Sequence, residues 1–133
     1  MQTLEQLLLT IGGKSILLNQ LERDPDYDLI LSKGKIFTNE KIFVEMEQNK
    51  CHWNVSKLFD EGFISHIVIG YALSLEGIWF QHTWGIVDCI LVETSEVNYN
   101  NVLTYFGVQL DNPEEFTGLC KKHKAGEGKI RRF

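Results

Sequence analysis

His66-Ile-Val-Ile-Gly-Tyr-Ala-Leu-Ser74 is a run of residues 66–74 rich in β-branched and aromatic side chains, which favours a strand. Leu75-Glu76-Gly77 follows as a turn, and Ile78-Trp-Phe-Gln-His-Thr-Trp84 is predicted to be the second strand of a hairpin. Further strands are predicted at Cys89–Thr94 and Thr104–Val108. These four runs together predict an antiparallel meander.

Apolar residues at helical spacing indicate helices outside this meander. Leu4, Leu8 and Ile11 recur on one stripe of residues 3–11, and Val55 and Leu58 do so within Cys51–Asp60. The other expected elements are a short helix over residues 16–21, short strands at Tyr27–Ile30 and Lys35–Thr38 around a hairpin at Lys33-Gly34, and a helix from Asn112 to about Lys122. We therefore expect an α+β fold in which an antiparallel sheet is flanked by helices.

The length and composition predict one ordinary folded domain. The chain has 133 residues, 44% of them hydrophobic and 23% charged, which excludes disordered and low-complexity proteins. Residues 121–133 hold six of the thirteen basic residues and one of the eighteen acidic ones, so the remainder has a net charge of −10. We expect a single domain over residues 1–123 and a flexible basic tail over residues 124–133, with weak contact of the tail to an acidic partner as the alternative.

Charge, cysteine content and hydropathy restrict the environment and the partners. A net-acidic body disfavours nucleic-acid binding, and no apolar run approaches the ~20 residues of a membrane helix. The start lacks the basic region of a secretory signal. Three cysteines at unpatterned positions (Cys51, Cys89 and Cys120) predict reduced thiols in the cytoplasm, the last two buried. Because no C-x-x-C or H-x-x-x-H pair occurs, we expect no metal site.

Cys51, His82 and Glu93 are the candidate catalytic residues. A thiol at a helix N-terminus is favoured as thiolate, a strand histidine can accept its proton and return it to a leaving group, and an acid beyond the histidine fixes its orientation. Alternation places Phe80, His82 and Trp84 on one strand face, and strand pairing can bring Glu93 opposite or diagonal to His82. The alternative is a buried thiol, a core histidine and an exposed strand-end acid.

The chain also resembles a group of small uncharacterised bacterial and phage proteins in its sequence motifs. The matching stretches are Cys51-His52-Trp53-Asn54, Gly70-Tyr71, His82-Thr83-Trp84 and Glu93-Thr94-Ser95, in the pattern C-H-x-N, G-[YW], H-[ST]-W and E/D-x-T. The order helix cysteine, strand histidine, strand acid is similar to that of the papain-like superfamily, which includes bacterial cell-wall amidohydrolases and deamidases. The resemblance covers about residues 51–110. It implies a papain-like fold with Cys51 as nucleophile, His82 as base and Glu93 as the orienting acid.

Other side chains are candidates for contacts with a substrate. Asn54 lies one helical turn after Cys51, where it can donate to an oxyanion or a substrate carbonyl; a hydrogen bond inside the helix is the alternative. Trp84 is expected in the core or as the wall of a substrate cleft. The Tyr105 hydroxyl can reach the site from the last strand, although nothing in the sequence requires it.

Two functions of different classes are consistent with these residues. The first is a cysteine-dependent hydrolase of an amide or acyl bond, a peptidase, amidase or deamidase, with a protein or peptide-like substrate and no metal or organic cofactor. The second is a non-catalytic protein-binding factor, for example a phage-encoded inhibitor of a host protein, since an acidic body with many aromatic residues suits a binding face. A Cys51 thiol close to His82 in an open cleft favours the enzyme, and a thiol sealed in the core favours the binding factor.

Overall fold

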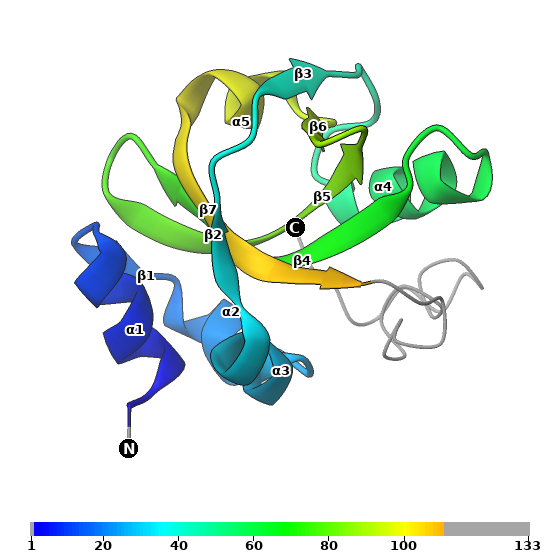
Figure 1. Cartoon of the computed structure of the whole chain (residues 1–133). Helices are drawn as coiled ribbons and strands as arrows, with labels where there is room; N and C mark the ends of the chain where they lie inside the picture. Colours follow the sequence, from blue (N-terminus) through cyan, green and yellow to red (C-terminus); the bar gives the residue numbers. More distant parts are fainter. Residues whose placement is uncertain (1, 111–133) are drawn as a thin grey trace.

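The computed structural model describes residues 2–110, which form a mixed α+β fold with helices flanking a curled, mostly antiparallel sheet (Figure 1). The strands are β1 (Ser15–Ile16), β2 (Lys35–Phe37), β3 (Lys41–Phe43), β4 (His66–Ser74), β5 (Ile78–Val87), β6 (Ile90–Glu93) and β7 (Val102–Leu110). The helices are α1 (Leu4–Ile11), α2 (Leu18–Glu22), α3 (Tyr27–Lys33), α4 (Cys51–Asp60) and α5 (Glu96–Asn101).

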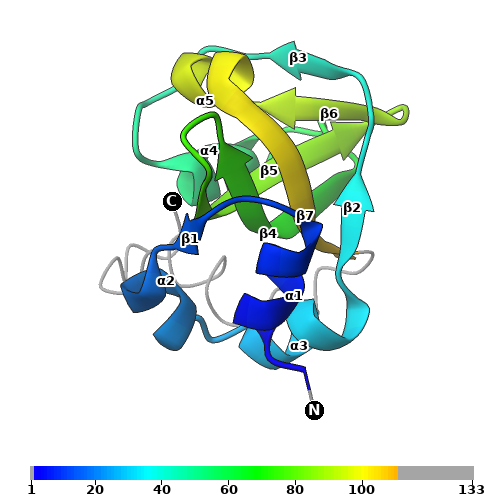
Figure 2. The ribbon, with the colours of Figure 1, turned by 90° about the vertical axis from the view of Figure 1, so that its left-hand side faces the viewer.

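The sheet order is β2-β7-β4-β5-β6-β3, with β1 parallel to β5 and β3 parallel to β6. The predicted meander is confirmed for β4, β5 and β6, but it is wrong for β7, which pairs with β4. Helix α5 carries the chain across the end of the sheet, and the Leu75 N–H donates to the Asn101 carbonyl oxygen at 2.9 Å. Because β7 does not pair with β6, the outer edge of β6 pairs with β3 instead (Figure 2).

Strand alternation divides the core between the two faces of the sheet. The outer face packs against the helices through one apolar cluster, which includes Ile67, Ile69 and Trp79 together with residues of α1, α3 and α4. The inner face, inside the curl, carries a second cluster that includes Val68, Trp84 and Tyr105. His82 belongs to the inner face, as the alternation of Phe80, His82 and Trp84 predicts.

Two glycines allow the sheet to curl at the row that contains His82. Gly70 of β4 pairs with His82 on one side and with Gly107 of β7 on the other. A Cβ at Gly70 would collide with the backbone carbonyl of Phe106, and one at Gly107 would collide with the carbonyl of Ile69. Only glycine leaves room for the backbones of β4 and β7 to approach this closely.

The predicted strand at Tyr27–Ile30 is wrong, because these residues begin α3. Ile30 is fully buried on the helix, and the Tyr27 hydroxyl accepts a hydrogen bond from the Leu4 N–H at 3.0 Å, so packing against α1 favours the helical form. Gly34 ends α3, and its N–H donates to the Ile30 carbonyl at 2.8 Å. The predicted hairpin at Lys33-Gly34 is therefore also wrong, and β2 pairs with β7 instead.

The predictions for Cys89 and for the end of the chain have different outcomes. Strand β5 continues to Val87, and Asp88 and Cys89 form its turn into β6 with φ values of 48° and 64°. Cys89 is therefore exposed rather than buried. The helix expected from Asn112, the thiol of Cys120 and the tail over residues 124–133 lie outside the described residues. None of the helices within residues 2–110 combines the length and the hydropathy of a membrane-spanning segment.

Candidate active site

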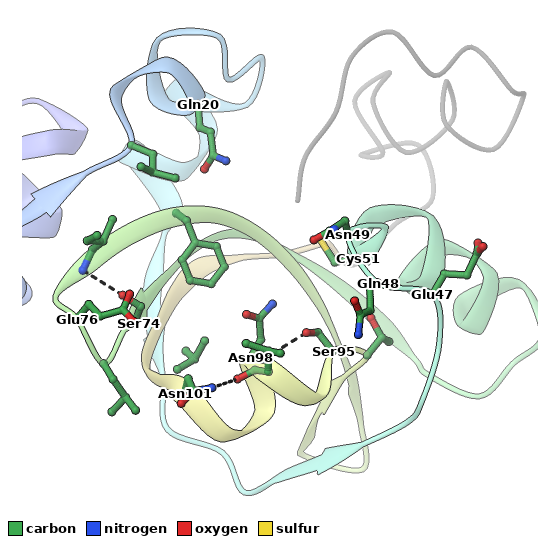
Figure 3. Close-up of a pocket in the computed structure, with 17 residues that line it drawn as sticks. Gln20, Glu47, Gln48, Asn49, Cys51, Ser74, Glu76, Ser95, Asn98 and Asn101 are labelled. Carbon is green, nitrogen blue, oxygen red and sulfur yellow. Dashed lines mark hydrogen bonds between the residues drawn. The ribbon is translucent and has the colours of Figure 1, made fainter.

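Cys51 is the first residue of α4 and lines a pocket of about 550 Å³ (Figure 3). The helix docks through the buried side chains of Val55 and Leu58, and His52 Nδ1 lies 3.0 Å from Thr83 Oγ1 of β5. Lys50 precedes the helix without a capping side-chain hydrogen bond. The first N–H groups of a helix have no partner within it, so the sulfur lies in the positive field of the helix start. Cys51 as a whole is 5% exposed to solvent.

His82 lies in the middle of β5 with its side chain fully buried. Its Nε2 is 2.9 Å from both carboxylate oxygens of Glu93. A side-chain hydrogen bond also joins His82 to Cys51. The structure therefore brings the three predicted residues together in the order Cys51, His82, Glu93.

Glu93 ends β6 and is fully buried. The last pair between β5 and β6 is Gly85 with Val92, so the next residue, Glu93, lies diagonal to His82 on the inner face. Besides His82, the carboxylate accepts hydrogen bonds from the Thr94 N–H at 3.2 Å and the Tyr105 hydroxyl at 2.7 Å. These donors satisfy the hydrogen-bonding capacity of a buried carboxyl group.

The charges in this network favour a protonated His82. Burial by itself lowers the pKa of His82, but Glu93 and Cys51 raise it, and the result is well above the ordinary value of 6.5. Burial, together with the charge and hydrogen bond of Glu93, raises the pKa of Tyr105, which keeps its hydroxyl a donor. Burial lowers the pKa of Lys41, whose ammonium lies 5.3 Å from the centre of the Tyr105 ring, and Glu93 partly offsets that effect.

Aromatic rings surround the imidazole and restrict its rotation. The centroid of His82 lies 5.5 Å from Phe80, 5.9 Å from Trp84 and 6.3 Å from Tyr105. Trp84 is fully buried and also contacts Tyr105 and Phe37 edge-on. The geometry does not support the expectation that Trp84 walls a substrate cleft, because its ring packs behind His82 inside the curl.

Asn54 is buried, and its side-chain amide is directed at two oxygen atoms of the protein itself. Its Nδ2 donates to the Glu47 carbonyl at 2.7 Å and approaches Thr94 Oγ1 at 3.4 Å. These contacts connect the loop before α4 to the end of β6. Asn54 therefore fixes the position of Cys51 relative to Glu93. Among the described residues, the pocket lining does not include Asn54. The geometry therefore favours a positioning role over the expected contact with an oxyanion.

The sequence alone does not indicate which residues form the wall of the pocket opposite Cys51. Helix α5 contributes Asn98 and Asn101, and Gln20 of α2 points into the pocket from the other side (Figure 3). The Gln20 Oε1 accepts a hydrogen bond from the Gln81 N–H at 2.6 Å, which orients its amide N–H groups. The only local feature of the sequence that indicates this wall is Ser95, which caps α5 by accepting a hydrogen bond from the Asn98 N–H. Nothing in the chain near Gln20 indicates its partner, 61 residues away.

Comparisons with protein-family models, with curated proteins and with solved structures found no match to this chain. Within residues 2–110, no group of three or more His, Cys, Asp and Glu side chains is arranged to hold a metal ion. The function of the site must therefore be inferred from its own geometry.

Replacing Glu93 with glutamine tests the electrostatic coupling. We expect Glu93→Gln to cost about 3 kcal/mol in the free energy of unfolding at pH 6, because a buried charged acceptor is lost and one amide N–H group faces a donor. A raised folded-state pKa of His82 adds stability that is complete below 6.5 and is lost as pH rises through the folded-state pKa. The difference in the free energy of unfolding between wild type and variant should therefore become smaller as pH rises. Urea unfolding from pH 6 to 9 measures it. A difference that grows with pH would contradict the coupling.

Proposed function

We propose that this protein is a cysteine-dependent hydrolase of an amide or related acyl bond, of papain-like type, with Cys51, His82 and Glu93 as its catalytic triad. The observation that carries the proposal is the position of His82. It is hydrogen-bonded to a thiol that lines a pocket on one side and to a buried carboxylate on the other. A peptidase, an amidase and a deamidase all use this chemistry.

The reaction follows from the order of these groups. His82 accepts the proton of the Cys51 thiol, and the sulfur forms a bond to the carbonyl carbon of the substrate. The bond from that carbon to the leaving nitrogen breaks, and the nitrogen takes the proton from His82. A water molecule then attacks the thioester while His82 accepts its proton, so that a carboxylic acid is released and the thiol is restored. Glu93 holds the imidazole and stabilises its charged form throughout.

Two groups at the pocket are suited to stabilise the negative oxygen of the tetrahedral intermediate. The backbone N–H of Cys51 lies at the uncapped start of α4. The amide N–H groups of Gln20 are available because its Oε1 is already bound to the Gln81 N–H. Both residues line the same pocket, the Cys51 N–H beside the nucleophile and Gln20 on the wall that faces it.

The same geometry favours the enzyme over the non-catalytic binding factor. A buried ion pair usually contributes little or nothing to stability compared with apolar packing. A binding face needs no such pair beneath it, whereas catalysis does. Cys51 is also not sealed in the core, since its residue contributes to the lining of the pocket.

The proposal predicts that p-nitrophenyl acetate acetylates Cys51. We expect release of p-nitrophenolate, a thioester on the peptide that contains Cys51, and loss of both in Cys51→Ala. Cys89→Ser provides the matched control, because it removes an exposed thiol away from the pocket and should leave the reaction unchanged. Peptide mapping by mass spectrometry locates the acetyl group. Acetylation confined to Cys89 and Cys120 would refute the proposal.

A further inference from the structure

Large apolar side chains are exposed around the mouth of the pocket. Leu17, Leu75 and Val97 are 44%, 57% and 61% exposed, and all three line it. They come from three separate parts of the chain: the segment before α2, the β4–β5 turn and α5. Ile78 and Phe80 of β5 add partly buried apolar surface to the lining. Apolar groups that gather at a concave surface mark a binding site for an apolar ligand group.

Carboxamides form half of the polar lining, five of ten side chains when Cys51 is left aside. Gln20 and Asn98 point into the pocket from opposite sides (Figure 3), and Gln48, Asn49 and Asn101 complete the set. A carboxamide carries both N–H donors and a carbonyl acceptor, as a peptide group does. Side chains of this kind can pair with the backbone of a bound peptide without requiring that it be charged.

The charges at the pocket are of one sign. Among the described residues that line it, the carboxylic acids are Glu47 and Glu76, and neither lysine nor arginine is present. Figure 3 shows these two acids at opposite ends. Glu47 is paired with Lys50 at 3.4 Å, which leaves Glu76 as the less compensated charge. A carboxylate bound in this pocket would be repelled, and an ammonium group would be attracted.

We infer that Cys51 acts on a peptide whose side chain at the cleaved acyl group is apolar or cationic, and that acidic side chains are rejected. This inference rests on the proposed function and adds the class of its substrate. The apolar rim receives the side chain, the carboxamides pair with the peptide backbone, and Glu76 favours a positively charged end.

Three chloromethyl ketones test the inference, each built on acetyl-glycyl and ending in norleucine, lysine or glutamate. The three side chains have similar length and differ in charge. The rate of Cys51 alkylation is divided by that of Cys89 in the same molecule, which cancels the intrinsic reactivity of each reagent. We expect this ratio to be about tenfold higher for norleucine than for glutamate, with lysine close to norleucine.

Variants at the rim assign the selectivity to the pocket. Leu17→Asn combined with Val97→Asn should reduce the preference for norleucine, whereas Leu103→Asn, at a residue that is 59% exposed and outside the lining, should not. Glu76→Gln should lower the rate with lysine relative to norleucine, with Glu61→Gln as the exposed control. Equal ratios for the three reagents, or a preference unchanged in the rim variants, would overturn the inference. Cys51 reactivity that depends on His82 would then leave the proposed function intact.

Discussion

Alkylation of Cys51 by iodoacetamide at pH 6 is expected to slow about a hundredfold in His82→Ala. Iodoacetamide reacts with the thiolate, and the substitution removes the imidazole that is hydrogen-bonded to Cys51 and accepts the thiol proton. The raised pKa of His82, to which Glu93 and Cys51 both contribute, is the structural reason for this expectation.

Peptide mapping measures Cys51 and Cys89 separately at each pH between 5 and 9. Cys89 lies in the exposed β5–β6 turn and should react at the same rate in wild type and variant. Circular dichroism and the urea midpoint show whether His82→Ala remains folded, and Tyr105→Phe provides a second variant that weakens only the support of Glu93. Equal pH profiles for Cys51 in wild type and folded His82→Ala would remove the assisted thiol from the mechanism.

Gly70→Ala is expected to destabilise the fold by about 3 kcal/mol. The added methyl group would meet the Phe106 backbone carbonyl, which cannot rotate away as a side chain can. Gly70 pairs directly with His82 in β5 and with Gly107 in β7. Strain at this position therefore separates β4 from β7 and shifts the strand that carries the base.

The urea midpoint of the variant measures the loss, and Gly12→Ala is the matched control. Gly12 has an extended backbone with φ of 166°, and a Cβ there would meet its nearest heavy atom, of Leu73, at 3.4 Å. Its substitution should change stability by less than about 1 kcal/mol. If Gly70→Ala were as stable as Gly12→Ala, the close approach of β4 and β7 would not be the reason for glycine at position 70.

Several elements of the site could be predicted from the sequence because short-range patterns determine them. The apolar stripe of α4 predicts a helix that begins at Cys51, and the structure confirms it. The run on either side of Gly77 predicts the β4–β5 hairpin, and alternation then places His82 on the same face as Trp84. The diagonal position of Glu93 follows from the next hairpin. Each of these results depends on residues within one helix or one hairpin.

Only the tertiary structure decided how distant segments meet around these elements. Strand β7 pairs with β4 rather than β6, which brings the Tyr105 hydroxyl to Glu93. Packing against α1 makes Tyr27–Lys33 a helix, although its composition also suits a strand. Gln20 reaches the pocket through a hydrogen bond to a residue 61 positions away. The physical reason is that periodicity and turn chemistry act within a single element, whereas strand order and pocket walls depend on packing and on the entropy of closing long loops.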